Sequence, residues 1–109
     1  MTSPIDQYIA LLFAWNGKIR LTGAADPASF FQEQVSEVLP LVDWVARTEN
    51  PLLVDIGSGN GLLDIPMAAG LPGRQIVALE PAFKKCVFLR AVKAALALDN
   101  LQIIQQSLE

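Results

Sequence analysis

In the first half of the chain, apolar residues recur three and four positions apart, which is the spacing of one face of a helix. The first such stripe predicts an amphipathic helix over 5–15, with Ser3 as its N-cap and a proline directly after the cap. The second stripe runs over 30–45 and follows Asp26-Pro27, another cap-and-proline start. Pro40 lies inside this second stripe, where it predicts a kink or a split of the helix.

After residue 50 the pattern changes to short apolar runs that alternate with helix-forming segments. We expect strands over 52–56, 76–79 and 101–104, and helices over 62–69 and 83–98. Alternation of this kind predicts a parallel sheet with crossover helices. The first run is nearly continuous and β-branched, so we expect its strand to be buried on both faces. The chain is interpreted as one α/β domain over 1–109, helical over 1–50 and β-α-β-α-β over 51–109.

Composition limits the class of protein. The chain has 109 residues, of which 52% are hydrophobic, yet no apolar run approaches the roughly 18 residues of a membrane span. The apolar excess is therefore assigned to a core or an interface. No basic cluster precedes an apolar stretch at the N-terminus, so we expect no signal peptide and a cytoplasmic location.

Charge and the missing residue types limit the chemistry. Eight basic and 11 acidic residues give a net charge of −3. This charge argues against strong, sequence-independent binding of nucleic-acid phosphates. Cys86 is the single cysteine and there is no histidine, so we expect neither an internal disulfide nor a metal site. Chemistry must come from a cofactor or from acids and lysines.

The most informative stretch is the one that follows the first strand, where Gly57, Gly59 and Gly61 alternate with other residues before a helix begins. Such a turn is expected to aim free backbone N–H groups and the positive end of a helix at a nucleotide-type ligand. The spacing is G-x-G-x-G, one residue shorter than the dinucleotide pattern. Glu80 ends the second strand, where its carboxylate is placed to accept bonds from both hydroxyls of a ribose. A turn that binds no ligand is the alternative.

This version of the loop resembles motif I of the class I methyltransferases, which bind S-adenosylmethionine. More specifically, nearly the whole chain resembles the glucose-inhibited division protein B family, the guanine-N7 methyltransferases of small-subunit ribosomal RNA. The matching segments are Trp15-Asn16, Leu21-Thr22, Asp26-Pro27, VDIGSGNG over 54–61, Ile65-Pro66, KKCVFLR over 84–90 and the strand entry over 98–104. The resemblance implies a partial class I methyltransferase (Rossmann-like) fold and S-adenosylmethionine as the cofactor.

The resemblance also implies which residues hold the cofactor: Asp55, Gly57, Ser58, Gly59, Gly61 and Glu80. In this assignment Asp55 braces the loop and favours the ammonium group of the cofactor, and Glu80 holds the ribose. Methyl transfer from a sulfonium is mostly a matter of alignment, because the leaving thioether is neutral. No catalytic residue is therefore assigned.

The chain also departs from the family. Arg20, Gln34, Leu63-Asp64 and Ser107 stand where the family usually has other residues. The chain stops after the third strand, before the parts that complete the pocket and contact the target base. We therefore expect a truncated or degenerate S-adenosylmethionine-binding domain, inactive in methyl transfer by itself, with ribosomal RNA as a further candidate partner. The alternative is a non-catalytic interaction module with the same fold. The glycine spacing disfavours a dinucleotide oxidoreductase fragment.

Other candidate residues are given structural interpretations. Cys86 is expected in the core, and Trp15 and Trp44 in helix packing. The basic residues on the last helix are expected to form a solvated face rather than an RNA contact: Lys84, Lys85, Arg90 and Lys93.

Topology predicts self-association. In the fold that the chain resembles, strands two and three lie successively outward from strand one on one side, and a fourth strand pairs with strand one on the other. Without that fourth strand, the first strand (52–56) becomes an edge with unpaired backbone groups. We therefore expect a homodimer or a higher assembly joined through this strand or its flanking helices.

Overall fold

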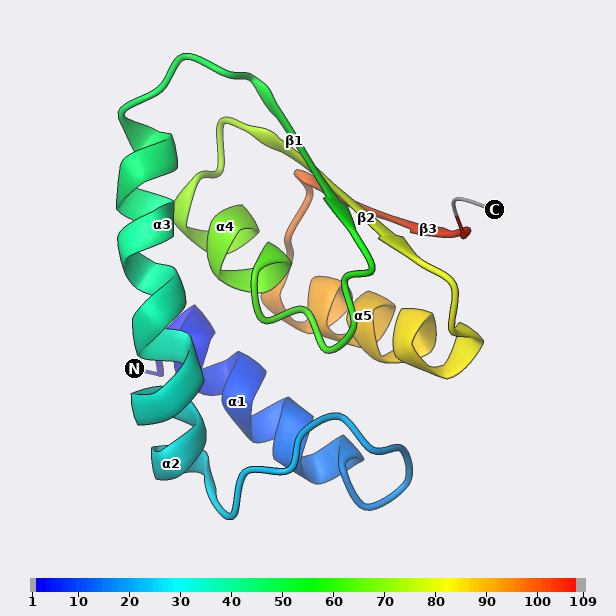
Figure 1. Ribbon diagram of the computed structural model, residues 1–109. Helices are drawn as coiled ribbons and strands as arrows, with labels where there is room; N and C mark the ends of the chain where they lie inside the picture. Colours follow the sequence, from blue (N-terminus) through cyan, green and yellow to red (C-terminus); the bar gives the residue numbers. More distant parts are fainter. Residues whose placement is uncertain (1, 108–109) are drawn as a thin grey trace.

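The computed structural model describes residues 2–107, with helices first and a parallel sheet afterwards (Figure 1). The elements are α1 (Pro4–Trp15), α2 (Pro27–Phe30), the π-helical segment η1 (Phe31–Val35), α3 (Ser36–Ala46), β1 (Leu52–Ile56), α4 (Asp64–Gly70), β2 (Gln75–Glu80), α5 (Phe83–Leu96) and β3 (Leu101–Gln105). The predicted fold class, a helical N-terminal part followed by three parallel strands with crossover helices, is confirmed.

The helix starts that the sequence predicts are confirmed by their capping bonds. The Ser3 hydroxyl oxygen accepts the N–H of Asp6 at 3.1 Å, and the Asp26 carboxylate accepts the N–H of Ser29 at 2.8 Å. Both bonds satisfy a donor that the first turn of a helix leaves without a partner. The side-chain oxygen of Asn16, just after α1, accepts the N–H groups of the connector residues Leu21 and Thr22 at 2.7 and 3.0 Å.

Pro40 does not split the second helical stretch. It lies inside α3, and the irregular turn is η1, which ends directly before α3. A proline ring removes one backbone hydrogen bond and crowds the carbonyl four residues earlier. The π-helical turn η1 ends at Val35, directly ahead of Ser36, whose carbonyl is the one four residues before the proline.

The three strands are parallel and lie in the order β1-β2-β3, as predicted. Val54 is opposite Val77, and Val77 is opposite Gln102. Among the described strands, β1 pairs only with β2, so it is an edge of this sheet. The carboxyl ends of β1 and β2 lie next to each other, which brings the glycine loop and Glu80 together.

The helices form layers on one side of the sheet (Figure 1). α4 packs against β2, α5 packs against β2 and β3, and α1 packs on α4 and α5. Tyr8, Phe30 and Phe88 are fully buried between these elements. Trp15 packs edge-on against Phe88 at 5.7 Å between ring centroids, and Cys86 is buried, so both predictions of a packing role are confirmed.

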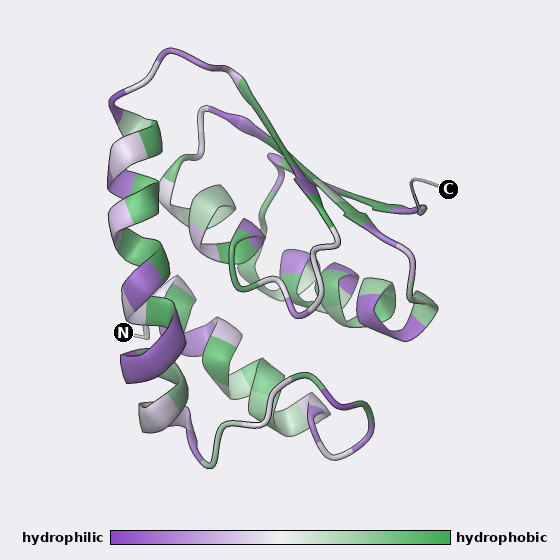
Figure 2. Ribbon diagram, in the orientation of Figure 1, coloured by the Kyte–Doolittle hydropathy of each residue, from purple (hydrophilic) through white to green (hydrophobic). Residues whose placement is uncertain are grey.

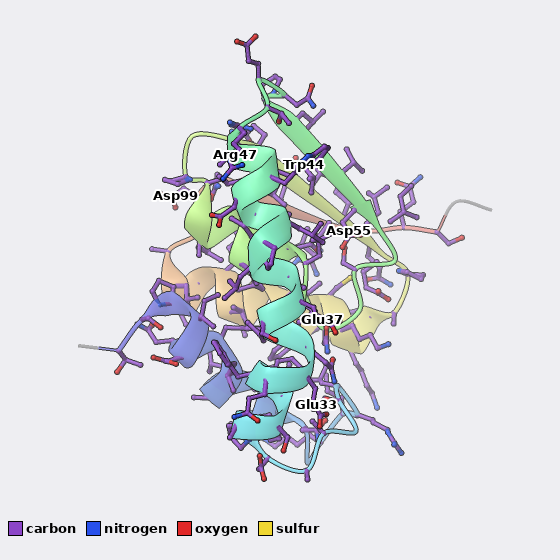
Figure 3. All side chains as sticks on the ribbon, turned by 60° about the vertical axis from the view of Figure 1, so that its left-hand side comes forward. Glu33, Glu37, Trp44, Arg47, Asp55 and Asp99 are labelled. Atoms are coloured by element: carbon purple, nitrogen blue, oxygen red, sulfur yellow. The ribbon has the colours of Figure 1, made fainter. Side chains whose placement is uncertain are left out.

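The prediction that β1 is buried on both faces is wrong. Leu52, Val54 and Ile56 are 54%, 47% and 60% exposed, while Leu53 and Asp55 point to the helical side. The reason is that α4 and α5 cover one face of the sheet only. In Figure 2 most of β1 has the green colour of hydrophobic residues. Trp44 is also not in helix packing, since it is 65% exposed on α3 (Figure 3).

Within residues 2–107 no helix is long and apolar enough to cross a membrane.

Candidate functional site

The glycine loop between β1 and α4 has the left-handed backbone that glycine adopts without strain. Gly57, Gly59 and Gly61 have φ angles of +76°, +61° and +81°, where another residue would cost about 1–2 kcal/mol. A side-chain carbon added at Gly57 would meet nothing within 4 Å, and one at Gly59 would meet only the Gly57 carbonyl oxygen at 3.9 Å. A ligand can therefore approach the backbone at these two positions.

The third glycine has a packing role. A side-chain carbon added at Gly61 would lie 2.7 Å from Cδ2 of Leu89 and 2.9 Å from Cγ1 of Ile65. Both distances are shorter than atoms in contact allow. Gly61 therefore lets the loop pass closely over α5 and the start of α4, while the first two glycines face open space.

Glu80 holds the loop in place. Its carboxylate is buried, and Oε1 accepts the N–H of Gly59 at 2.7 Å while Oε2 accepts the N–H of Ala82 at 2.8 Å. In the structure the loop is thus braced by Glu80, the role that the sequence interpretation gave to Asp55. Each carboxylate oxygen can accept a second hydrogen bond, so a ribose contact of Glu80 stays a prediction.

The expectation that the loop presents free N–H groups is wrong for most of its residues. The N–H groups of Gly57 and Ser58 donate to the Leu79 carbonyl at 2.8 and 3.2 Å. That of Gly61 donates to the Ser58 carbonyl at 3.0 Å, and that of Leu62 to the Asn60 side-chain oxygen at 3.0 Å. The tight turn uses its donors internally. It is therefore poorly suited to cradle a phosphate, which needs free N–H groups.

Acidic groups surround the loop instead. Asp55 lies on the helical side of β1, where Figure 3 shows its side chain near the loop, and Asp64 begins α4. Asp55 and Glu80 give the loop an acidic environment, which favours a cationic ligand over an anionic one. Burial, and then the charge of Asp55, raise the pKa of Asp64 to about 8.

Two residues that the sequence analysis missed tie the loop to the N-terminal helices. The hydroxyl of Tyr8 donates to the Asn60 carbonyl at 2.8 Å, and the Asn60 side-chain amide donates to the Leu21 carbonyl at 2.9 Å. Burial raises the pKa of Tyr8. Tyr8 lies on the apolar stripe of α1, and nothing in the pattern of that stripe indicates a contact with residue 60.

A shallow cleft of about 300 Å³ lies beside the start of α5, close to Glu80 in the chain. Its lining combines two aromatic rings with two cationic side chains: Trp15, Lys18, Ile19, Phe83, Lys84 and Val87. Sequence reasoning missed this cleft, because Lys18 and Phe83 come from parts of the chain with no shared pattern.

The basic residues of α5 differ in how far their side chains are exposed to solvent. Lys84 and Arg90 are exposed, as predicted for a solvated helix face. The prediction of a solvated face is wrong for Lys85 and Lys93, which are half-buried. The Lys93 ammonium donates to the Leu101 carbonyl at the start of β3.

Comparison with known proteins identifies the family. Residues 1–109 match the GidB family, described as rRNA small subunit methyltransferase G. Ribosomal RNA small subunit methyltransferase G of Pseudomonas fluorescens is 37% identical over 102 residues, which are 94% of this chain and 46% of that protein. The protein of the same name from Helicobacter pylori is 36% identical over 109 residues, which are 100% of this chain and 60% of that protein.

The matches run through the helical N-terminal part as well as the glycine loop. The chain spans about half the length of the curated relatives that it matches. The match of the family over residues 1–109 agrees with the resemblance seen in the sequence segments, and with the parallel sheet. This chain belongs to the GidB family of small-subunit ribosomal RNA methyltransferases.

Proposed function

We propose that this chain is an S-adenosylmethionine-binding domain related to the small-subunit ribosomal RNA methyltransferases. The observation that carries the proposal is the glycine loop, open at Gly57 and Gly59 and surrounded by Asp55, Asp64 and Glu80. S-adenosylmethionine bears a sulfonium and an ammonium group and has no phosphate, so it fits an acidic loop with few free N–H groups. A dinucleotide, with its pyrophosphate, fits this loop poorly.

Individual roles follow from the positions of the residues. Gly57, Ser58 and Gly59 would lie against the methionine part of the cofactor, with Asp55 favouring its ammonium group. Glu80, already fixed by two backbone N–H groups, would use its remaining acceptor positions for the ribose hydroxyls. Gly61 would keep the loop packed closely on Leu89 and Ile65. The bound cofactor supplies the methyl group, and we assign no catalytic residue to the chain.

Ribosomal RNA is the proposed partner, because the relatives are named for it. We assign ribosomal RNA to the cleft in which Lys18 and Lys84 lie beside the aromatic rings of Trp15 and Phe83. Two cations can neutralise phosphates locally even though the net charge of the chain is negative.

We expect weak binding of S-adenosylmethionine and of S-adenosylhomocysteine, and no binding of the dinucleotide NAD, in calorimetric titrations. Gly59→Val should abolish the binding heat, because valine at φ +61° is strained and deforms the loop. Gly73→Val is the matched control, since an added side chain there meets nothing within 4 Å. Equal heats for both variants, or no binding at millimolar ligand, would contradict the proposal.

A specific observation favours the second candidate, an interaction module. β1 is an edge strand among the described strands, and Leu52, Val54 and Ile56 leave an apolar surface beside that edge. Exposed edges with apolar side chains are templates for pairing with another chain. We propose that two copies associate through β1.

Light scattering coupled to size exclusion should therefore give the mass of a dimer or a larger species. Val54→Lys should shift the protein to the monomer, because a charge on this strand cannot be buried in a partner interface. Gln102→Lys adds the same charge to β3 on the same sheet face and should leave the assembly intact. A monodisperse wild-type monomer at high concentration would contradict association through β1.

A further inference from the structure

Asp64 is unusual among the acidic residues of the chain. Its side chain is 0% exposed, and within residues 2–107 neither carboxylate oxygen has a hydrogen-bond partner. An ionised carboxylate without partners is among the most unfavourable groups to bury. A group in such a position is therefore expected either to be protonated or to await a charged partner.

Polar residues from three parts of the fold lie around Asp64. Asp55 approaches from β1, Ser58 from the loop and Tyr8 from α1. The Tyr8 hydroxyl donates to the Asn60 carbonyl, and the Ser58 hydroxyl donates to the Asp55 carbonyl at 3.3 Å.

No cation is among the groups that shift the pKa of Asp64 within residues 2–107. On α5, the apolar Leu89 lies against Gly61 of the loop. On β2, the Glu80 carboxylate is engaged by the N–H groups of Gly59 and Ala82. Asp55 is therefore the charged group that acts on Asp64.

Two neighbouring carboxyl groups in a buried site resist being ionised together, so one of them keeps a proton. Asp64 is the more deeply buried of the two, because Asp55 is only half-buried. The pKa of Asp64, raised to about 8 by burial and by Asp55, agrees with a protonated Asp64 at neutral pH.

We propose that Asp64 is a positioning residue that holds a proton beside Asp55 in the free protein and releases it when the ammonium group of a ligand binds against Asp55. The inference rests on the proposed function and deepens it, because it assigns the amino-acid end of the cofactor to this carboxyl pair. The ammonium brings one positive charge as one proton leaves Asp64 for solvent, so the net charge of the site is unchanged.

Calorimetry in two buffers with different heats of ionisation counts the protons released per ligand bound. At pH 6.5, S-adenosylhomocysteine should release up to one proton from the wild-type protein. The analogue 5′-methylthioadenosine, which has no ammonium group, should release almost none. Affinity for S-adenosylhomocysteine should rise up to tenfold between pH 6 and pH 7, since one proton is exchanged.

Asp64→Asn should bind S-adenosylhomocysteine without proton release and with no rise in affinity over this range. Asp99→Asn, which removes an exposed carboxylate far along the chain, should behave as the wild type does. A general loss of stability would change affinity but not the number of protons released. The comparison of the two ligands on the wild-type protein needs no variant.

Binding of S-adenosylhomocysteine to the wild type without proton release would overturn the inference and leave the proposed function standing. Absence of binding by either nucleoside would overturn the proposed function and the ammonium role together. The carboxyl pair has its own test in the free protein, by NMR titration of the Asp64 carboxyl carbon. An ordinary pKa for that group would overturn the pair, and a pKa that falls in Asp55→Asn would support it.

Discussion

Gly61→Ala is expected to destabilise the protein by about 2–5 kcal/mol, against about 1–2 kcal/mol for Gly57→Ala in the same loop. Both glycines have positive φ angles, +81° and +76°, so both substitutions carry a backbone cost of about 1–2 kcal/mol. Only at Gly61 does the new methyl group collide with Leu89 and Ile65, which adds about 1–3 kcal/mol of overpacking.

Urea denaturation followed by circular dichroism measures both losses. For a domain of this size, a loss of 1 kcal/mol lowers the melting temperature by about 4–8 °C, so a thermal scan separates the variants as well. Equal losses at the two positions would show that Leu89 and Ile65 move aside, and that the loop does not pack on α5 as described.

Asp64→Asn is expected to gain stability relative to the wild type as pH rises from 5 to 8, by up to about 4 kcal/mol over the three units. The pKa of Asp64 in the folded protein is raised to about 8 by burial and by Asp55, against about 3.9 in an unfolded chain. Between these values the unfolded chain has lost the proton while the folded protein keeps it. Wild-type stability therefore falls as pH rises through this window, by at most about 1.4 kcal/mol per pH unit.

The measurement is a series of urea denaturation curves between pH 5 and pH 8. Asp99→Asn controls for the change in net charge, since Asp99 is exposed. A constant difference between wild type and Asp64→Asn over the whole range would mean that Asp64 is already ionised in the folded protein at pH 5.

Local signals in the sequence predicted the elements and part of the site. Ser3 and Asp26 cap the helices that they were expected to start, and the strand over 52–56 has the expected bounds. These features depend on a few adjacent residues. The glycine turn also needs positive φ angles at Gly57 and Gly59, and that requirement is visible in the sequence.

What the sequence could not predict depends on contacts between distant segments. The exposure of Val54 follows from which sheet face the helices cover, and periodicity carries no such information. Tyr8 reaches Asn60 across 52 positions. Likewise, Asp64 was visible only as a departure from a family pattern, and its burial beside Asp55 emerges from the packing of α4 under the loop.

The most direct test of the central claim is an NMR titration of the backbone amides with S-adenosylhomocysteine. The account predicts shifts concentrated at residues 55–59, at Glu80 and at Ala82, where the loop and its brace meet the ligand. Shifts that avoid the loop, for instance ones confined to α3 or β3, would contradict it, as would an unchanged spectrum at millimolar ligand.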